Sequence, residues 1–191
     1  RRHRAWTAVD AAFRRPPRST EQLLHADAYA ADERPIAVAI ATPPSLAGWR
    51  AVYSDVWGEA GWLALLRAHG VAPSPAATAA AGWGGDRVAV FAREGEPDPR
   101  RAVAIAVTTW DDEVDAIEAA EALVRALDAF AGTALAREAE RGRWLDGARL
   151  SWVERRGAHV IVVIGAPLIT ADALATEVWR AATVDKQRLA K

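Results

Sequence analysis

The chain has 191 residues, of which 51% are hydrophobic and 26% are charged. These proportions fit one compact domain, or two small halves that share a core, and exclude a disordered chain. The 24 lysines and arginines nearly balance the 25 acidic residues, so no overall field would draw the chain onto nucleic acid or an anionic membrane. The longest apolar run, residues 158–168, falls short of the roughly 20 residues of a membrane-spanning helix.

Two residue types are missing from the sequence. It contains no cysteine, which excludes a disulfide framework, a cysteine zinc site and a thiol nucleophile but leaves the redox compartment open. It contains no methionine either, and it opens on Arg1. We therefore expect a processed or truncated piece of a longer translation product.

The first half of the chain reads as helices. Apolar residues at helical spacing predict a short helix over residues 1–13, which two prolines end. Ser19 and Gln22 stand three apart, as in a capping box, and predict a helix over residues 19–29. Residues 36–41 read as an extended segment, whereas apolar residues three or four apart predict a strong helix over residues 46–66. Residues 71–81, rich in proline, alanine, serine and threonine, lead into the glycines at 82, 84 and 85, and this is the candidate boundary between two halves.

The second half reads as two hairpins, each followed by a helix. Residues 87–91 and 102–109 predict the first hairpin, and residues 148–154 and 158–164 the second. A helix capped by Asp111 or Asp112 runs to Gly132, and another covers residues 170–183. We expect an α+β fold, in which a helical segment, residues 1–81, precedes a mostly antiparallel β-β-α-β-β-α domain, residues 82–191, with helices on one face. The two parts share one core.

No catalytic motif is visible in the residues. The four histidines are scattered without the spacing of a zinc site, and no serine sits in a nucleophile elbow. The glycines at 82, 84 and 85 lack the Lys-Ser/Thr of a phosphate loop. Residues 111–128 carry seven acids against one base, and residues 1–18 six arginines against one acid. These opposite charges could pair across an interface, although acids in a first helical turn also stabilise the helix dipole.

The nine tryptophans allow two interpretations. A tryptophan suits a core, or a groove that holds a peptide or a glycan. For Trp83 and Trp110, which flank the first hairpin, both stay open. Gly84 and Gly85 predict a turn with positive φ, in which Asp86 and Arg87 bond the turn's amides and a neighbouring carboxylate.

Four segments together resemble a family of uncharacterised bacterial and archaeal envelope proteins, often lipoproteins, that are similar to gluzincin-type zinc metallopeptidases. The first is Pro-Arg-Ser-Thr-Glu-Gln-Leu-Leu-His at residues 17–25, followed by Tyr29. The others are Trp57-Gly58-Glu59, Gly-Trp-Gly-Gly-Asp-Arg at residues 82–87, and Trp110-Asp111 with Asp115-Ala116. Trp57 replaces the family's usual leucine, and residues 26–28 depart from its Pro-Glu-Lys.

The resemblance implies that the chain is the C-terminal, non-catalytic part of such a protein. The family's His-Glu-x-x-His helix lies upstream, so we expect no cofactor in this chain, and any zinc would belong to a missing N-terminal part. His25 and Glu59 are then the candidates for a cleft shared with that part. An extracytoplasmic location follows from the same resemblance.

We therefore expect an accessory domain that positions substrate, its partner being an N-terminal catalytic-like half or a separate subunit. The alternative is a free-standing module that binds peptide or glycan through Trp83, Trp110, Asp86 and Arg87. Asp111, next to Trp110, is a further candidate binding residue. A pseudoenzyme whose partner subunit supplies zinc is a third interpretation.

Overall fold

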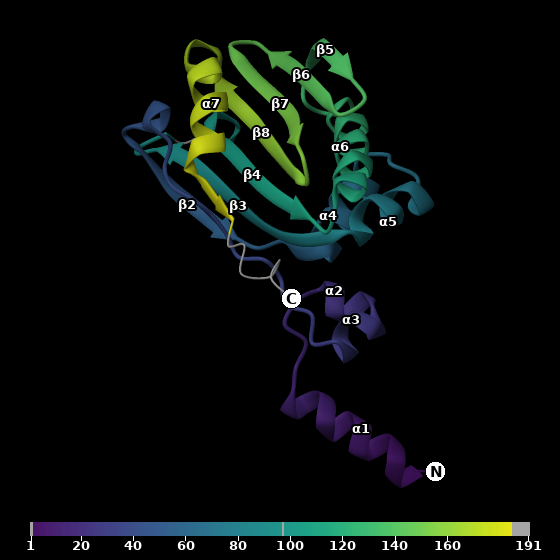
Figure 1. The fold of residues 1–191 in the computed structure, drawn as a ribbon. Coiled ribbons are helices and arrows are strands. Elements are labelled where there is room, and N and C mark those ends of the chain that lie inside the picture. Colours follow the sequence, from purple (N-terminus) through teal and green to yellow (C-terminus); the bar gives the residue numbers. More distant parts are fainter. Residues whose placement is uncertain (1, 97, 185–191) are drawn as a thin grey trace.

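The computed structural model describes residues 2–96 and 98–184; Arg1, Pro97 and residues 185–191, which fall within the predicted helix, the first predicted hairpin and the predicted second domain, lie outside this description. Seven antiparallel strands form one sheet in the order β2-β3-β4-β8-β7-β6-β5 (Figure 1). They are β2 (Trp49–Asp55), β3 (Trp83–Arg93), β4 (Val103–Trp110), β5 (Thr133–Glu138), β6 (Arg141–Asp146), β7 (Arg149–Arg156) and β8 (His159–Pro167). A separate pair joins β1 (Val38–Ile40) to β9 (Ala182–Val184).

The helices are α1 (Arg2–Arg14), α2 (Glu21–Leu24), α3 (Ala26–Ala30), α4 (Gly58–Ala68), α5 (Pro73–Ala81), α6 (Glu113–Leu127) and α7 (Ala171–Ala181). The α+β class, the antiparallel sheet and the N-terminal helices are confirmed. Among the described residues, no helix has the length and apolar character needed to cross a membrane.

Both faces of the sheet are buried. Helices α4, α5 and α6 cover one face, where Val88 and Val162 meet Leu123. Helix α7 and β1 cover the other face, where Ile105 and Ile161 meet Leu174 and Val178 of α7. Helices thus lie on both faces rather than on one, because the central strands β4 and β8 carry apolar residues at consecutive positions and so need cover on each side.

The predicted helix over residues 46–66 is wrong in its first half. Residues Trp49–Asp55 form β2, an edge strand whose side chains are mostly exposed. An edge strand with little burial needs no alternation of apolar and polar residues. Trp49, Val52 and Val56 happen to be spaced as on one face of a helix, and this spacing led to the wrong prediction. The true helix, α4, begins only at Gly58, which has a φ of +67°.

The stretch before the expected boundary, residues 71–81, contains a helix, α5. Pro73 stands in the first turn of α5, where its missing N–H costs nothing. Ala76, Ala79 and Ala80 are buried, and α5 packs on both α4 and α6. Since β2 belongs to the main sheet and α5 to its core, the structure does not change from helical to sheet architecture at residue 82.

Other expectations are confirmed, with local differences. The hairpins β3–β4 and β7–β8 and the helices α6 and α7 are present, and Asp112 caps α6 by accepting hydrogen bonds from two backbone amides. Strands β5, β6 and β9 were not predicted; every residue of β5 is exposed. The predicted helix over residues 19–29 breaks at His25, whose backbone is extended, into α2 and α3.

Neither Gly84 nor Gly85 has a positive φ, so the predicted turn is wrong. They lie in β3, where the segment before β1 crosses them: Ile36 N donates a hydrogen bond to Gly84 O at 2.7 Å. A Cβ atom on Gly85 would overlap the backbone carbonyl of Ile36. The glycines are therefore needed for close approach of two backbones.

This close approach predicts the effect of Gly85→Ala. The added methyl group meets backbone that cannot rotate away, so we expect a loss of more than about 2 kcal/mol in the free energy of unfolding. Gly147→Ala, in the β6–β7 turn, meets open space and has only its positive φ to strain it, which costs about 1 kcal/mol. Urea unfolding of both variants measures the difference; equal losses would contradict the crossing as the cause.

Candidate functional site

The first turn of α4 is held by two side chains from distant parts of the chain. The carboxylate of Asp86, on β3, accepts hydrogen bonds from Trp57 N at 3.1 Å, Gly58 N at 3.3 Å and Trp62 Nε1 at 2.9 Å. The hydroxyl of Thr20 accepts another from Ala60 N at 3.2 Å. The amides of a first helical turn have no partner within their own helix, so these two residues fix where α4 starts.

Asp86 is almost completely buried, at 1% exposure. Burial raises the pKa of its carboxyl group, while the hydrogen bonds from Trp57, Trp62 and Gly58 and the charge of Arg87 act against that rise. The Asp86 carboxylate therefore acts as the N-cap of α4, although it lies 28 residues after Gly58 in the sequence.

His25 and Glu59 form a hydrogen-bonded pair. His25 Nε2 lies 2.8 Å from Glu59 Oε1, and the Glu59 side chain is 4% exposed whereas that of His25 is 39% exposed. The hydrogen bond to Glu59 raises the pKa of His25. Burial raises the pKa of Glu59, and the hydrogen bond from His25 opposes this. The pair joins the break between α2 and α3 to the first turn of α4.

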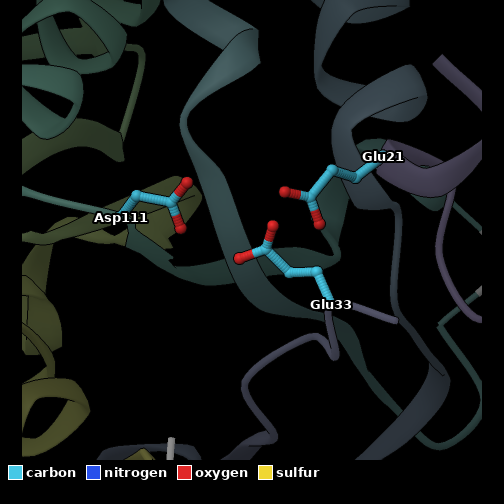
Figure 2. A group of neighbouring side chains, drawn as sticks. All are labelled: Glu21, Glu33 and Asp111. Carbon is cyan, nitrogen blue, oxygen red and sulfur yellow. The ribbon is translucent and has the colours of Figure 1, made fainter. Parts of the chain in front are cut away.

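Three further carboxylates converge beside this pair. The carboxylate oxygens of Glu21, Glu33 and Asp111 lie within 4.8 Å of one another, and Figure 2 shows the three groups directed toward a common point. Glu21 belongs to α2, Glu33 follows α3, and Asp111 follows β4. We call these three residues the carboxylate cluster.

The crossing at Gly84 and Gly85 brings the cluster together. Gln22 Nε2 donates to the backbone carbonyl of Glu33, and Arg18 N donates to Gln22 Oε1 at 2.8 Å. The segment that starts at Glu33 then crosses β3, next to the end of β4 where Asp111 lies. As the capping box predicted, Ser19 Oγ accepts from Gln22 N and Gln22 reaches back, although its Oε1 bonds Arg18 N rather than Ser19 N. The Nε2 of Gln22 additionally holds this loop.

The pKa of Asp111, one member of the cluster, is raised. Desolvation is the largest cause, and the negative charges of Asp115, Asp112 and Glu59 add to it. The pKa of Asp115 is raised too, by desolvation and by Asp112. Oxygen ligands of this kind suit a hard cation such as Ca²⁺ or Mg²⁺, and among the described residues this cluster is the group that could hold one. Acidic groups are also common without an ion, so the cluster by itself assigns no metal.

A cleft opens on the other side of the α4 start. It has a volume of about 560 Å³ and lies between the chain around α2, the extended segment before β1 and the beginning of β3. Arg18 and Arg87 both line it, as do the exposed side chains of Leu23 and Val56. This volume lies within the range of small-molecule and peptide sites.

A family model matches residues 46–175, and its description is a domain of unknown function, DUF8575. The chain belongs to this family. No curated protein and no solved structure matches the chain. The matched range includes Glu59, Asp86 and Asp111, whereas Glu21, His25 and Glu33 precede it.

The predicted site residues divide into two groups. His25 and Glu59 are brought together as a pair, with Asp111 nearby. Trp83, Trp110 and Asp86 are buried at 1%, 2% and 1% exposure, so they support the fold and offer no ring face to a ligand. Arg87 lies at the cleft with its Nε donating to the backbone oxygen of Val38 at 3.2 Å, not to a neighbouring carboxylate as expected.

The sequence reasoning missed three residues of the site. Thr20 and Glu21 stood inside the quoted segment 17–25, so the motif gave a signal that was left unused. Glu33 lies in a polar stretch without any distinguishing pattern. Only the crossing of two segments far apart in sequence shows where its carboxylate lies.

Replacing Asp86 tests its role as the cap of α4. In Asp86→Ala, three N–H groups lose a buried acceptor, and we expect the free energy of unfolding to fall by about 3 kcal/mol. The control is Asp172→Ala, because Asp172 is an exposed partner of Arg143 and such pairs contribute little. Thermal unfolding with circular dichroism compares them. A small loss in Asp86→Ala would show that water caps the helix equally well.

The raised pKa of Asp111 predicts a pH effect. Between the ordinary pKa of an aspartate, about 4, and the raised folded value, the folded state holds more protons than the unfolded state. Stability therefore falls as the pH rises through this window, and above it the ionised group is destabilising. Asp111→Asn should raise the melting temperature at pH 8, with the gain disappearing near pH 3. Asp146→Asn, at the exposed end of β6, should show no such gain; an equal response in both variants would contradict repulsion at Asp111.

Proposed function

We propose that this chain is the non-catalytic, substrate-positioning domain of a metallopeptidase-like envelope protein. The observation that carries the proposal is the meeting of the four segments that resemble that family. Thr20 bonds the helix start that contains Gly58, His25 bonds Glu59, and Asp86 caps the same turn. Asp111 joins them through the carboxylate cluster.

This meeting favours a shared function over separate local uses. Residues separated by 28 to 40 positions in sequence contact one helix start, and the half-exposed His25 ring stands at the surface above the buried Glu59. A histidine in this position can exchange a proton or donate a hydrogen bond to a polypeptide that docks there. The domain would thus present one side of a cleft to a catalytic-like half.

Helix α1 supports the presence of such a partner. It extends away from the sheet (Figure 1), and the apolar side chains of Trp6, Val9 and Phe13 are 68%, 42% and 83% exposed. Arg15, which follows the helix, is held in place: it stacks on the ring of Tyr29, and Tyr29 Oη donates to Arg15 O at 2.7 Å. An exposed apolar helix face marks a surface that another body covers. The partner would be the N-terminal half, which would also hold any zinc.

A free-standing peptide- or glycan-binding module is the second candidate. The cleft lined by Arg18 and Arg87 favours it, although three of the residues expected to form its surface are buried. In this case the chain would act at its own length, without a peptidase.

Two measurements on the native polypeptide decide between them. We expect an intact mass well above 20.5 kDa and, in that longer protein, peptide hydrolysis that depends on the pair. His25→Ala and Glu59→Gln should raise KM about tenfold, a loss of about 1.4 kcal/mol, and leave kcat within about twofold, since only substrate binding is affected.

His69→Ala is the matched control, because His69 ends the same helix and packs on Phe130 with ring centroids 4.2 Å apart. It should change neither constant. Unchanged KM in both pair variants would remove the proposal, and a native mass near 20.5 kDa would give the lead to the binding module.

A further inference from the structure

The cleft beside the start of α4 lies at a gap in the sheet. Asp55, the last residue of β2, pairs with Val88 of β3. The residues of β3 before Val88 therefore continue beyond their neighbouring strand, and they form one wall of the cleft. The lining also includes Pro35 and Ile36, from the segment that lies against β3 where Ile36 N bonds Gly84 O. Extended walls of this kind suit a ligand that is itself an extended chain.

Two arginines, Arg18 and Arg87, line the cleft. Arg87 uses Nε to bond Val38 O, and among the described residues it has no ion-pair partner. The charge nearest to it in sequence, Asp86, is already bonded by three N–H groups. Arg18 lines the cleft as well, 46% exposed, with its Nε 3.3 Å from Asp32. Within residues 2–96 and 98–184, no acidic side chain pairs with the two terminal nitrogens of Arg87, and a guanidinium binds a carboxylate with two parallel hydrogen bonds.

Apolar side chains complete the lining. Leu23 and Val56 are 69% and 43% exposed where they border the cleft, and Trp57 is half-buried there. An apolar side chain of a ligand would cover surface that now faces water, and this favours binding. A glycan would instead need an exposed ring face, and Trp83 in the cleft wall is 1% exposed.

We propose that this cleft binds an extended peptide through a carboxylate held by Arg87, with an apolar side chain of the peptide against Leu23 and Val56. The inference rests on the proposed function, because it names the polypeptide class that the domain would position. The carboxylate comes from an acidic side chain or from a free C-terminus, and both present the same two oxygens to the guanidinium.

Fluorescein-labelled six-residue peptides and the 191-residue chain provide the test. Three peptides share an apolar extended sequence: one ends in a free carboxylate, one ends in an amide and carries an internal glutamate, and one ends in an amide without an acid. Fluorescence anisotropy should show binding of at least one acidic peptide, about tenfold or more tighter than the neutral one, and weakened by salt. The acidic peptide that binds identifies the source of the carboxylate.

Arg87→Gln should lower the affinity for the acidic peptide at least about tenfold and leave the affinity for the neutral peptide unchanged. The two affinities would then be similar. Arg93→Gln is the control, since Arg93 lies on the same strand but stacks on Trp49 away from the cleft, and it should bind like the parent chain. Melting curves check that both variants fold. If Arg87→Gln does not fold, the comparison of acidic with neutral peptides on the parent chain still decides.

Equal binding of all three peptides, no binding at millimolar concentration, or full affinity in a folded Arg87→Gln chain would each overturn the inference. These failures are distinct from failure of the proposed function, which is measured at His25 and Glu59 in the longer native protein. A chain that binds no peptide could still dock through α1, and a chain that binds acidic peptide while the pair variants leave KM unchanged would be a binding module.

Discussion

The buried carboxylate of Asp86 is the contact on which the site depends. It connects β3 to the first turn of α4 through Trp57, Gly58 and Trp62, and so it fixes the helix relative to the sheet. Glu59 is the next residue after Gly58, which means that its position, and the position of His25 bonded to it, follow from this cap. The cost of burying one charge is offset by three N–H donors and the positive end of a helix.

A second constraint is the close passage of two backbones at Gly84 and Gly85. It lets the segment after α3 lie on β3, and this places Glu33 beside Asp111. Desolvation, and then the charges of Asp115, Asp112 and Glu59, raise the pKa of Asp111, so holding this carboxylate here costs stability. Sites that carry function commonly hold groups whose charges disfavour each other. The arrangement therefore favours a role at this position, where Asp111 and the partly exposed His25 both reach the surface.

Sequence patterns predicted elements where burial was regular and failed where it was not. Strands β7 and β8 contain runs of buried residues because helices cover both faces of the sheet. Helix α6 begins with an aspartate that caps its own first turn. In contrast, β2 and β5 are edge strands with exposed side chains, so hydrophobic spacing carries no information about them. Helix α5 is formed from alanines around two prolines, a composition equally typical of a linker.

Some features of the candidate site could be predicted from the sequence and others could not. His25 and Glu59 were found because they stand in motifs, while the cap formed by Asp86 was not, since a capping side chain ordinarily precedes its helix by one residue and here arrives from a strand 28 positions later. Motif residues such as Trp83 and Asp86 proved to be buried supports. Two of the cleft residues open to a ligand, Leu23 and Val56, are exposed apolar residues with no motif role of their own. A motif search therefore locates the frame of this site, and only the fold identifies its surface.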